Sequence, residues 1–312
     1  RGEAPAAIRR PLCGLRGRLP SVWGCAFAAA AMYYRQRSHL SGPLQRGPPM
    51  KVPLIEIAIP SIYMKNGVRQ LLPTRMARCT PDMHAAITAV AAALETQGGK
   101  LFLSDLFRSY DMQLQAHLDW KSGKKSAFSP PPGGSMHEAG RALDLDLAAL
   151  KFGLAKFWPI AKTAGLSPII AKADSSLSEA WHFDCRGSHA VVYEYYRRGK
   201  GKNFSSAYAA MSASAINAVG IHLDAMGARQ REASIQFGLV RLGFELGSVD
   251  GNIGKLTRDA LNQAGVALGE LDAMLEAVED LLQAKYPAEY QIPAHLDALS
   301  LFETAAPKHV VA

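Results

Sequence analysis

The chain has 312 residues, of which 48% are apolar and 20% are charged, and its formal net charge is +8. This balance is typical of a globular protein with one large domain or two ordinary ones, because it provides enough apolar side chains for a sizeable core. No stretch of 18 or more apolar residues is present, so we expect no membrane-spanning helix.

The positive charge is concentrated in residues 1–49, which contain eight Arg, no Lys and one acidic residue, for a local net charge of +7. The remainder, residues 50–312, contains 27 basic and 26 acidic side chains, for a net charge of +1. A nucleic-acid-binding domain usually has a basic patch on its folded body. We therefore expect no nucleic-acid partner.

The basic leader is rich in Arg, Pro, Gly and Ala and has no helical or strand periodicity. One interpretation is a disordered or non-native extension that precedes a natural start at Met50. The alternative is an export signal, in which Arg residues precede a short apolar region at 22–32. That region is interrupted and no clear cleavage site follows it, so an export signal is not clearly identifiable.

From residue 81 the sequence predicts helices that alternate with strands. Pro81 begins a helix whose apolar residues recur at helical spacing until a Gly-Gly pair ends it. The short apolar run at 101–106 is typical of a buried strand. A second helix is expected at 111–121, and the segment 121–134 is predicted to be a loop because it contains three consecutive prolines.

Two later segments predict strands that bear polar residues. Residues 142–147 (ALDLDL) alternate between apolar and acidic side chains, so in a strand Asp144 and Asp146 would face one way and the leucines the other. A further short strand is expected at 181–184. From residue 209 onward the pattern is helical, with one interruption at 243–254.

The four cysteines include no closely spaced pair such as C-x-x-C, so the sequence indicates neither a zinc knuckle nor a redox motif. Two of them lie in the leader. We expect the other two, Cys79 and Cys185, to be free thiols.

Two histidines and two carboxylate residues supply the types of group that a hydrolytic metal site needs. Such a zinc site uses three nitrogen or oxygen ligands and leaves a fourth position for water. His137, Asp144 and His182 supply that number of ligands. Glu179, three residues before His182, is the candidate general base that takes a proton from the attacking water.

These residues belong to two segments that together resemble a known family, the zinc D-alanyl-D-alanine carboxypeptidases and D,D-dipeptidases. The family includes vancomycin-resistance enzymes and several phage endolysins, and its pattern is S-x-H-x-x-G-x-A-x-D followed by E-x-W-H. The fixed positions correspond here to Ser135, His137, Gly140, Ala142, Asp144, Glu179, Trp181 and His182. The resemblance implies one zinc ion per chain and hydrolysis of D-alanyl peptide bonds in peptidoglycan stem peptides.

The resemblance extends upstream to residues 107–113 (FRSYDMQ), which are similar to the family's Y-R-S-x-x-x-Q segment. It implies that Arg108 contacts substrate, since a guanidinium suits a carboxylate or a developing oxyanion. Gln113 and Ser135 are further candidates for substrate contact, with shaping of the loop as the alternative for Ser135. Asp146 either fixes a ligand histidine as a hydrogen-bond acceptor or ends the polar face of its strand.

Residues 233–264 resemble a three-helix peptidoglycan-binding module with the pattern V-Q-x-x-L-x-x-L-G-(Y/F), then V-D-G-x-(F/I)-G-x-x-T. Asp250, Gly251 and Gly254 are expected to form its turn rather than to contact a ligand. The closing Phe-Gln of the module is absent, and an accessory bundle without a ligand is the alternative. A wall-binding module would raise the local substrate concentration for an attached enzyme.

The elements and the two resemblances predict an α+β fold with a small, mainly antiparallel sheet, flanking helices and a C-terminal helical bundle. The expected organisation is a leader at 1–49, a zinc peptidase domain at 50–205, a helical peptidoglycan-binding domain at 206–285 and a tail at 286–312. The expected activity is that of a D-Ala-D-Ala carboxypeptidase, which implies a periplasmic or extracellular location. The alternatives are a cross-bridge endopeptidase of endolysin type and a non-catalytic peptidoglycan-binding protein with a structural metal.

Overall fold

The structure, a computed structural model, describes residues 52–293. The basic leader, with both interpretations of it, and the tail from residue 294 onward lie outside the described residues. None of the helices between residues 52 and 293 has the length and apolar character that crossing a membrane requires.

A six-stranded sheet forms the centre of the predicted peptidase region, with strands in the order β3-β2-β5-β6-β8-β7. Its strands are β2 (Pro60–Lys65), β3 (Val68–Leu71), β5 (Leu103–Asp105), β6 (Ala142–Leu145), β7 (Leu166–Pro168) and β8 (His182–Cys185). The strands β2 and β5 are parallel, and the other neighbours are antiparallel. A separate pair joins β1 (Ile55–Glu56) to β4 (Arg78–Cys79).

The predicted small, mainly antiparallel sheet therefore needs correction, because the observed sheet is larger and mixed. The physical reason is the connection between β2 and β5, which contains the helix α2 (Pro81–Glu95). Parallel neighbours need a crossover of a dozen or more residues, and a helix is the usual form of it.

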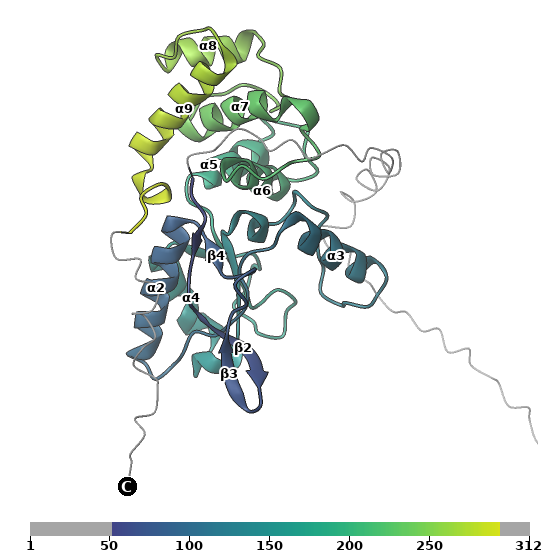
Figure 1. Cartoon of the computed structure of the whole chain (residues 1–312), viewed down its shortest axis with the longest axis vertical. Helices are drawn as coiled ribbons and strands as arrows, with labels where there is room; N and C mark the ends of the chain where they lie inside the picture. The colour runs from purple at the N-terminus through teal and green to yellow at the C-terminus, as the bar shows by residue number, and fades with distance from the viewer. Residues whose placement is uncertain (1–51, 294–312) are drawn as a thin grey trace, which may run out of the picture. The chain divides into compact units, whose positions relative to one another are not determined.

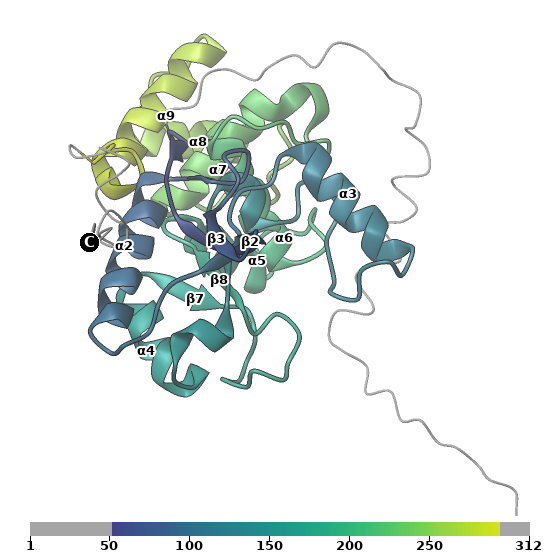
Figure 2. The ribbon, with the colours of Figure 1, turned by 60° about the horizontal axis from the view of Figure 1, so that its bottom comes forward.

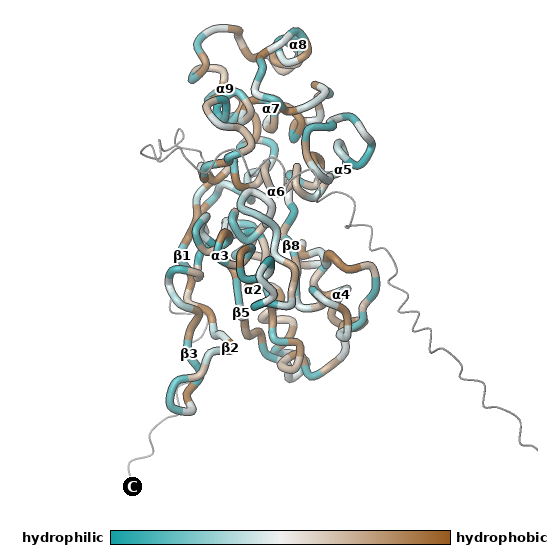
Figure 3. The backbone as a smooth tube through the Cα atoms, turned by 90° about the vertical axis from the view of Figure 1, so that its right-hand side faces the viewer, coloured by the Kyte–Doolittle hydropathy of each residue, from teal (hydrophilic) through white to brown (hydrophobic). Residues whose placement is uncertain are grey.

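The strands β2 and β3 form a hairpin at one edge of the sheet. Asn66 and Gly67 connect them, with φ angles of 52° and 78°. Two central residues with positive φ are characteristic of the tight turn that matches strand twist, and Asn-Gly is its preferred sequence. Figure 3 shows this hydrophilic turn at the tip of the hairpin.

One face of the sheet packs against α2 and α4 (Leu154–Thr163), which lie together on the same side in both ribbon views (Figures 1 and 2). Leu143 of β6 and Phe183 of β8 are fully buried in this core. Because side chains alternate along a strand, the residues beside them, Asp144 and His182, face the other side of the sheet. The helix α3 (Tyr110–Lys121) lies apart from α2 and α4 in the same two views.

The C-terminal half is helical, as predicted, and forms a second core. Its helices are α5 (His189–Arg197), α6 (Ala207–Ala218), α7 (Gln230–Leu242), α8 (Lys255–Gln263) and α9 (Leu271–Lys285). This core also includes Met136 and Ala139 of the short 3-10 helix η1 (Met136–Ala139). The helices are thus in contact with the segment that bears His137.

The turn predicted from the V-D-G pattern forms around the side chain of Gln236. Its Oε1 atom accepts hydrogen bonds from the backbone N–H groups of Asp250 and Gly251, at 3.0 and 2.8 Å. Its amide nitrogen donates to Thr257 Oγ1 at 3.2 Å, on α8. Asp250 and Gly251 are therefore engaged in the turn, as the sequence indicated.

Candidate metal centre

His137 lies on η1, whose start is fixed by side chains that the sequence places three residues apart. Ser135 Oγ accepts from the His137 backbone N–H at 3.3 Å, and Glu138 Oε2 accepts from the Ser135 N–H at 3.2 Å. This reciprocal pair is a capping box. Glu138 also accepts from the Gly133 N–H, and burial raises the pKa of its carboxyl to about 8 despite these hydrogen bonds.

Gly140 ends η1 with a φ of 64°. A Cβ atom at this position would lie 2.9 Å from the Cα of Cys79 and 2.8 Å from the side chain of Leu54. Both the left-handed conformation and the close approach of β4 therefore require glycine. The chain then enters β6, which places Asp144 Oδ1 3.3 Å from His137 Nε2.

Asp144 and His182 lie opposite each other on neighbouring strands, β6 and β8. Asp144 Oδ1 is 3.0 Å from His182 Nδ1 and 3.3 Å from His137 Nε2. The three potential ligand atoms all lie within 4.8 Å of one another, and the three residues are buried. The structure thus brings together the three residues that the sequence proposed as metal ligands.

The other nitrogen of each imidazole is already engaged. His137 Nδ1 lies 2.9 Å from the carbonyl oxygen of Leu106, to which it must donate. His182 Nε2 lies 2.9 Å from Asp184 Oδ1. The remaining nitrogen of each ring, His137 Nε2 or His182 Nδ1, is directed at Asp144. A neutral imidazole has only one N–H group, so in each ring one nitrogen would present its lone pair to a carboxylate oxygen.

Such an arrangement requires a positive charge between the rings and Asp144, supplied by protons or by a metal ion. Burial acts to raise the pKa of Asp144, but His137 and His182 hold it well below its ordinary value. Burial acts to lower the pKa of His182, but Asp184 and Asp144 raise it to about 10. His137 Nε2 is buried, and its 3.3 Å approach to Asp144 Oδ1 lacks the geometry of a hydrogen bond. Two imidazole nitrogens and a carboxylate oxygen are suitable ligands for zinc.

Glu179 is in the turn that precedes β8. Its φ of 67° is left-handed, which is uncommon for a residue other than glycine and is often found at functional sites. Its Oε1 atom is buried and has no hydrogen-bond partner in the described part of the chain. Burial raises the pKa of this carboxyl, although the charge of His182 acts in the opposite direction.

Arg108 is buried next to the ligand group, and three side chains hold its guanidinium. Nε donates to Asp105 Oδ2 at 2.6 Å, and one terminal nitrogen donates to Gln113 Oε1 at 3.2 Å. The other terminal nitrogen is 3.6 Å from Asp144 Oδ2. The guanidinium is therefore held in one orientation beside the candidate metal position.

Gln113 and Ser135, the other candidate substrate contacts, are both buried and engaged within the protein. The Gln113 amide nitrogen donates to Ser129 Oγ and to the Pro130 carbonyl, while its oxygen accepts from Arg108. Ser135 caps η1. Their contact with substrate remains a prediction, and in this structure they support Arg108 and His137.

Asp146 does not fix a ligand histidine, and it lies just beyond β6 rather than ending the polar face of that strand. The strand β6 ends at Leu145, and Asp146 caps the 3-10 helix η2 (Leu147–Leu150) by accepting from the Ala148 N–H at 3.0 Å.

The residue that holds His182 is Asp184, which the sequence analysis did not single out. The spacing of His182 and Asp184 was the available signal, because residues two apart in a strand share a face.

Cys79 and Cys185 are free, as predicted, and both are buried. Burial raises the pKa of both thiols, and Cys185 Sγ donates to Asp82 Oδ2 at 3.4 Å. Neither thiol belongs to the candidate ligand group.

No protein-family model matches the chain, and no curated protein matches it. Among solved structures, it is similar to the LdcB LD-carboxypeptidase, whose structure is described as revealing the molecular basis of peptidoglycan recognition. The two share 17% sequence identity with a TM-score of 0.32, and the similarity covers 42% of this chain and 66% of the other.

Proposed function

We propose that the chain is a zinc-dependent peptidase that hydrolyses D-alanyl bonds in peptidoglycan stem peptides, with His137, Asp144 and His182 as the metal ligands. The observation that carries this proposal is the convergence of three buried ligand atoms whose residues interact electrostatically with the carboxylate of Glu179, one oxygen of which is buried and unpartnered. A ligand group together with a base is the composition of a hydrolytic metal site.

The substrate part of the proposal rests on the sequence motifs. Eight fixed positions of the D-alanyl-D-alanine carboxypeptidase pattern occur in order, and the geometry gives most of them distinct roles. The pattern's glycine is Gly140, which permits the close approach to β4. Its serine is Ser135, which caps the ligand-bearing turn. The site supports the proposed chemical class, and the resemblance supports the proposed D-alanyl specificity.

Each side chain then has a defined task in hydrolysis. A zinc ion held by His137, Asp144 and His182 would supply Lewis acidity to the scissile carbonyl and to the attacking water. Glu179 takes a proton from the attacking water and delivers it to the departing amine. Its raised pKa suits this role, because a general base works best when its pKa is near the operating pH.

Arg108 is the proposed contact for the substrate's terminal carboxylate or for the oxyanion that develops during attack. Asp105, Gln113 and Asp144 fix its orientation before substrate binds. Donors that are held in place need no reorganisation during the reaction, which is the basis of oxyanion stabilisation.

Replacement of Glu179 by Gln tests the mechanism. The variant should retain one zinc per chain and lose at least 1,000-fold in kcat, about 4 kcal/mol of transition-state stabilisation. Exposed Glu194, which pairs with Arg197 on α5, provides the matched control Glu194→Gln. Full activity in Glu179→Gln would show that another group is the base.

Two alternatives are separable by substrate and by activity. A carboxypeptidase releases D-alanine from a free pentapeptide, whereas a cross-bridge endopeptidase cleaves cross-linked sacculi. A non-catalytic protein with a structural metal would do neither. The buried, unpartnered Oε1 of Glu179 argues against this alternative, because a structural site needs no base.

The remaining features of the proposal are the domain organisation and location. We assign the peptidase to residues 50–205 and a peptidoglycan-binding role to the helical region at 206–285. Action on peptidoglycan implies a periplasmic or extracellular location. Binding of the full chain to insoluble peptidoglycan in the presence of a chelator measures wall binding separately from catalysis.

A further inference from the structure

Two cationic side chains, Arg75 and Lys125, form no ion pair and no side-chain hydrogen bond within residues 52–293. Arg75 lies in the turn between β3 and β4, and Lys125 lies in the loop that follows α3. Arg108 differs from both, because three side chains hold its guanidinium. Arg75 and Lys125, the rim cations, therefore carry charges that no acidic group of the described structure neutralises by direct contact.

The turn that bears Arg75 is joined to the segment that bears Arg108. The backbone N–H of Phe107 donates to the Met76 carbonyl at 3.0 Å, which holds the two segments together one residue from each guanidinium-bearing position. The phenol of Tyr63, on β2, interacts electrostatically with both guanidinium groups. Arg75 is exposed. Its charge is thus at the solvent-facing edge of the candidate site.

The loop that bears Lys125 is fixed to α3 at both ends. At its start the Lys125 N–H donates to the Asp119 carbonyl at 3.0 Å, and at its end the Gln113 amide nitrogen donates to the Pro130 carbonyl at 2.7 Å. Both ribbon views place this loop beside the connection between β7 and β8, which contains Glu179 (Figures 1 and 2). Lys125 is partly buried and interacts electrostatically with Glu179.

The other charges around the centre balance when a divalent metal is bound, because a bound ion is the largest local charge. The ion and the Arg108 guanidinium together offset the carboxylates that act on Arg108, which are those of Asp105, Asp144 and Glu179. The carboxylate behind His182, that of Asp184, has Arg186 at 3.7 Å. The rim cations are then left without a counterpart, and uncompensated charges around a site attract ligands of the opposite sign.

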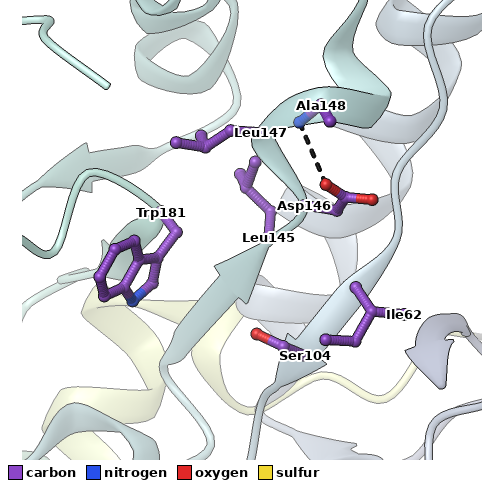
Figure 4. Close-up of a pocket in the computed structure, with 7 residues that line it drawn as sticks. All are labelled: Ile62, Ser104, Leu145, Asp146, Leu147, Ala148 and Trp181. Carbon is purple, nitrogen blue, oxygen red and sulfur yellow. Dashed lines mark hydrogen bonds between the residues drawn. The ribbon is translucent and has the colours of Figure 1, made fainter. Parts of the chain in front are cut away.

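The pocket at the end of β6 offers no alternative site for an anion. Figure 4 shows its lining, in which Asp146 is the one charged residue. A substrate carboxylate in this pocket would face a like charge, which is unfavourable. The rim cations are therefore the better match for negatively charged groups of a ligand.

We propose that Arg75 and Lys125 bind carboxylate groups of an acidic peptide substrate. A guanidinium suits a carboxylate as a planar fork of donors, and an ammonium suits it as a point charge. Carboxylate contacts at the rim leave Arg108 for the developing oxyanion, the second of the two roles proposed for it. This inference rests on the proposed function, because it assigns the rim cations to the substrate of the same site.

Calorimetric titration of the zinc-loaded full chain with two peptides tests the proposal. The acidic peptide has a glutamate side chain and a free C-terminal carboxylate, and the neutral peptide has both groups as amides. Each peptide carries a ketomethylene group in place of the D-alanyl amide bond, so neither is hydrolysed. We expect Kd to be about tenfold lower for the acidic peptide, because an exposed ion pair contributes up to about fivefold in affinity. The difference should shrink as salt is added.

The double variant Arg75→Gln/Lys125→Gln should bring the ratio of the two Kd values from about ten towards one. The matched control is Lys124→Gln/Arg197→Gln, which removes the same charge from exposed side chains that already have acidic partners. The control should keep the wild-type ratio. An unchanged ratio in the first variant overturns the proposal, and so does an equal fall in both, which would reflect net charge alone.

The outcome for the rim cations is separable from that for the proposed function. Preferential binding of the acidic peptide supports the rim even if the corresponding amide peptides are not hydrolysed, a result that would overturn the proposed function alone. Equal binding of the two peptides by the wild-type chain overturns the rim, even if D-alanine is released from a pentapeptide.

Discussion

Asp184 Oδ1 lies 2.9 Å from His182 Nε2, on the side of the imidazole ring away from Asp144. Tyr208, from α6, donates a hydrogen bond to the same carboxylate oxygen at 3.0 Å. Asp184 is fully buried. A carboxylate behind a ligand histidine fixes the ring's orientation and raises its basicity. The C-terminal helices therefore contribute, through Tyr208, to the support of a proposed metal ligand.

Replacement of Asp184 by Asn should weaken zinc binding by about 10- to 100-fold, since loss of such a partner typically has this effect. Competition with a chromogenic chelator measures the affinity. Tyr208→Phe leaves the carboxylate in place and should have a smaller effect. Equal zinc affinity in wild type and Asp184→Asn would contradict the assignment of His182 as a ligand.

A buried ion network connects the ligand-bearing segments to the end of the helical region. Arg141, next to Gly140, pairs with Asp82 at 2.8 Å and with Glu289 at 3.2 Å. Glu289 also pairs with Arg241 of α7 at 2.8 Å. The Arg141 backbone carbonyl accepts from the Cys185 N–H at 2.7 Å, which joins the network to β8.

Glu289→Gln should lower the free energy of unfolding by about 3 kcal/mol, because it leaves two buried guanidinium groups without a shared carboxylate. Urea denaturation of the full chain measures this change. Glu245→Gln is the control, since Glu245 forms an exposed pair with Lys200 that should contribute about 0–1 kcal/mol. Equal stability of the two variants would show that the network contributes little.

The buried imidazole of His189 should make the free energy of unfolding depend on pH. Burial lowers its pKa well below the ordinary 6.5, and the charges of Arg241 and Arg141 lower it further. The folded protein therefore keeps this ring neutral at a pH where the unfolded chain binds a proton. Below about pH 6.5, His189 should reduce the free energy of unfolding by about 1.4 kcal/mol per pH unit. His189→Gln should remove this contribution, which urea titrations at several pH values would detect; an identical slope in the variant would refute it.

Gly140→Ala should destabilise the protein and reduce zinc content, because the added methyl meets the backbone of Cys79. Gly199 has a similar left-handed φ of 73° but open space around it. Gly199→Ala should therefore cost only about 1–2 kcal/mol, the penalty of the conformation itself. Thermal melts and metal analysis of the two variants test this difference, and equal losses would show that contact with β4 is unimportant.

The candidate ligand group could be predicted because its residues lie in short segments with regular spacing. Alternation in β6 and β8 places Asp144 and His182 on one face of the sheet, and a strand pattern is visible in the sequence. The same rule failed for Asp146, because the chain leaves the sheet after Leu145 and turns into η2. A pattern of six alternating residues does not reveal where pairing with the neighbouring strand stops.

Long-range contacts could not be predicted. Arg141 and Glu289 are 148 residues apart, and no local pattern indicates that they meet in the core. The parallel pairing of β2 with β5 likewise depends on which elements become neighbours in space. The capping of η1 can be predicted from the sequence more readily, because Ser135 and Glu138 have the three-residue spacing of a capping box.

Metal content and activity of the full chain test the central claim most directly. Elemental analysis would be combined with an assay of D-alanine release from a stem pentapeptide, with and without a chelator. We predict one zinc per chain and release that the chelator abolishes and added zinc restores. Absence of bound zinc, or release that persists in the metal-free protein, would contradict the assignment of His137, Asp144 and His182 as a catalytic metal site.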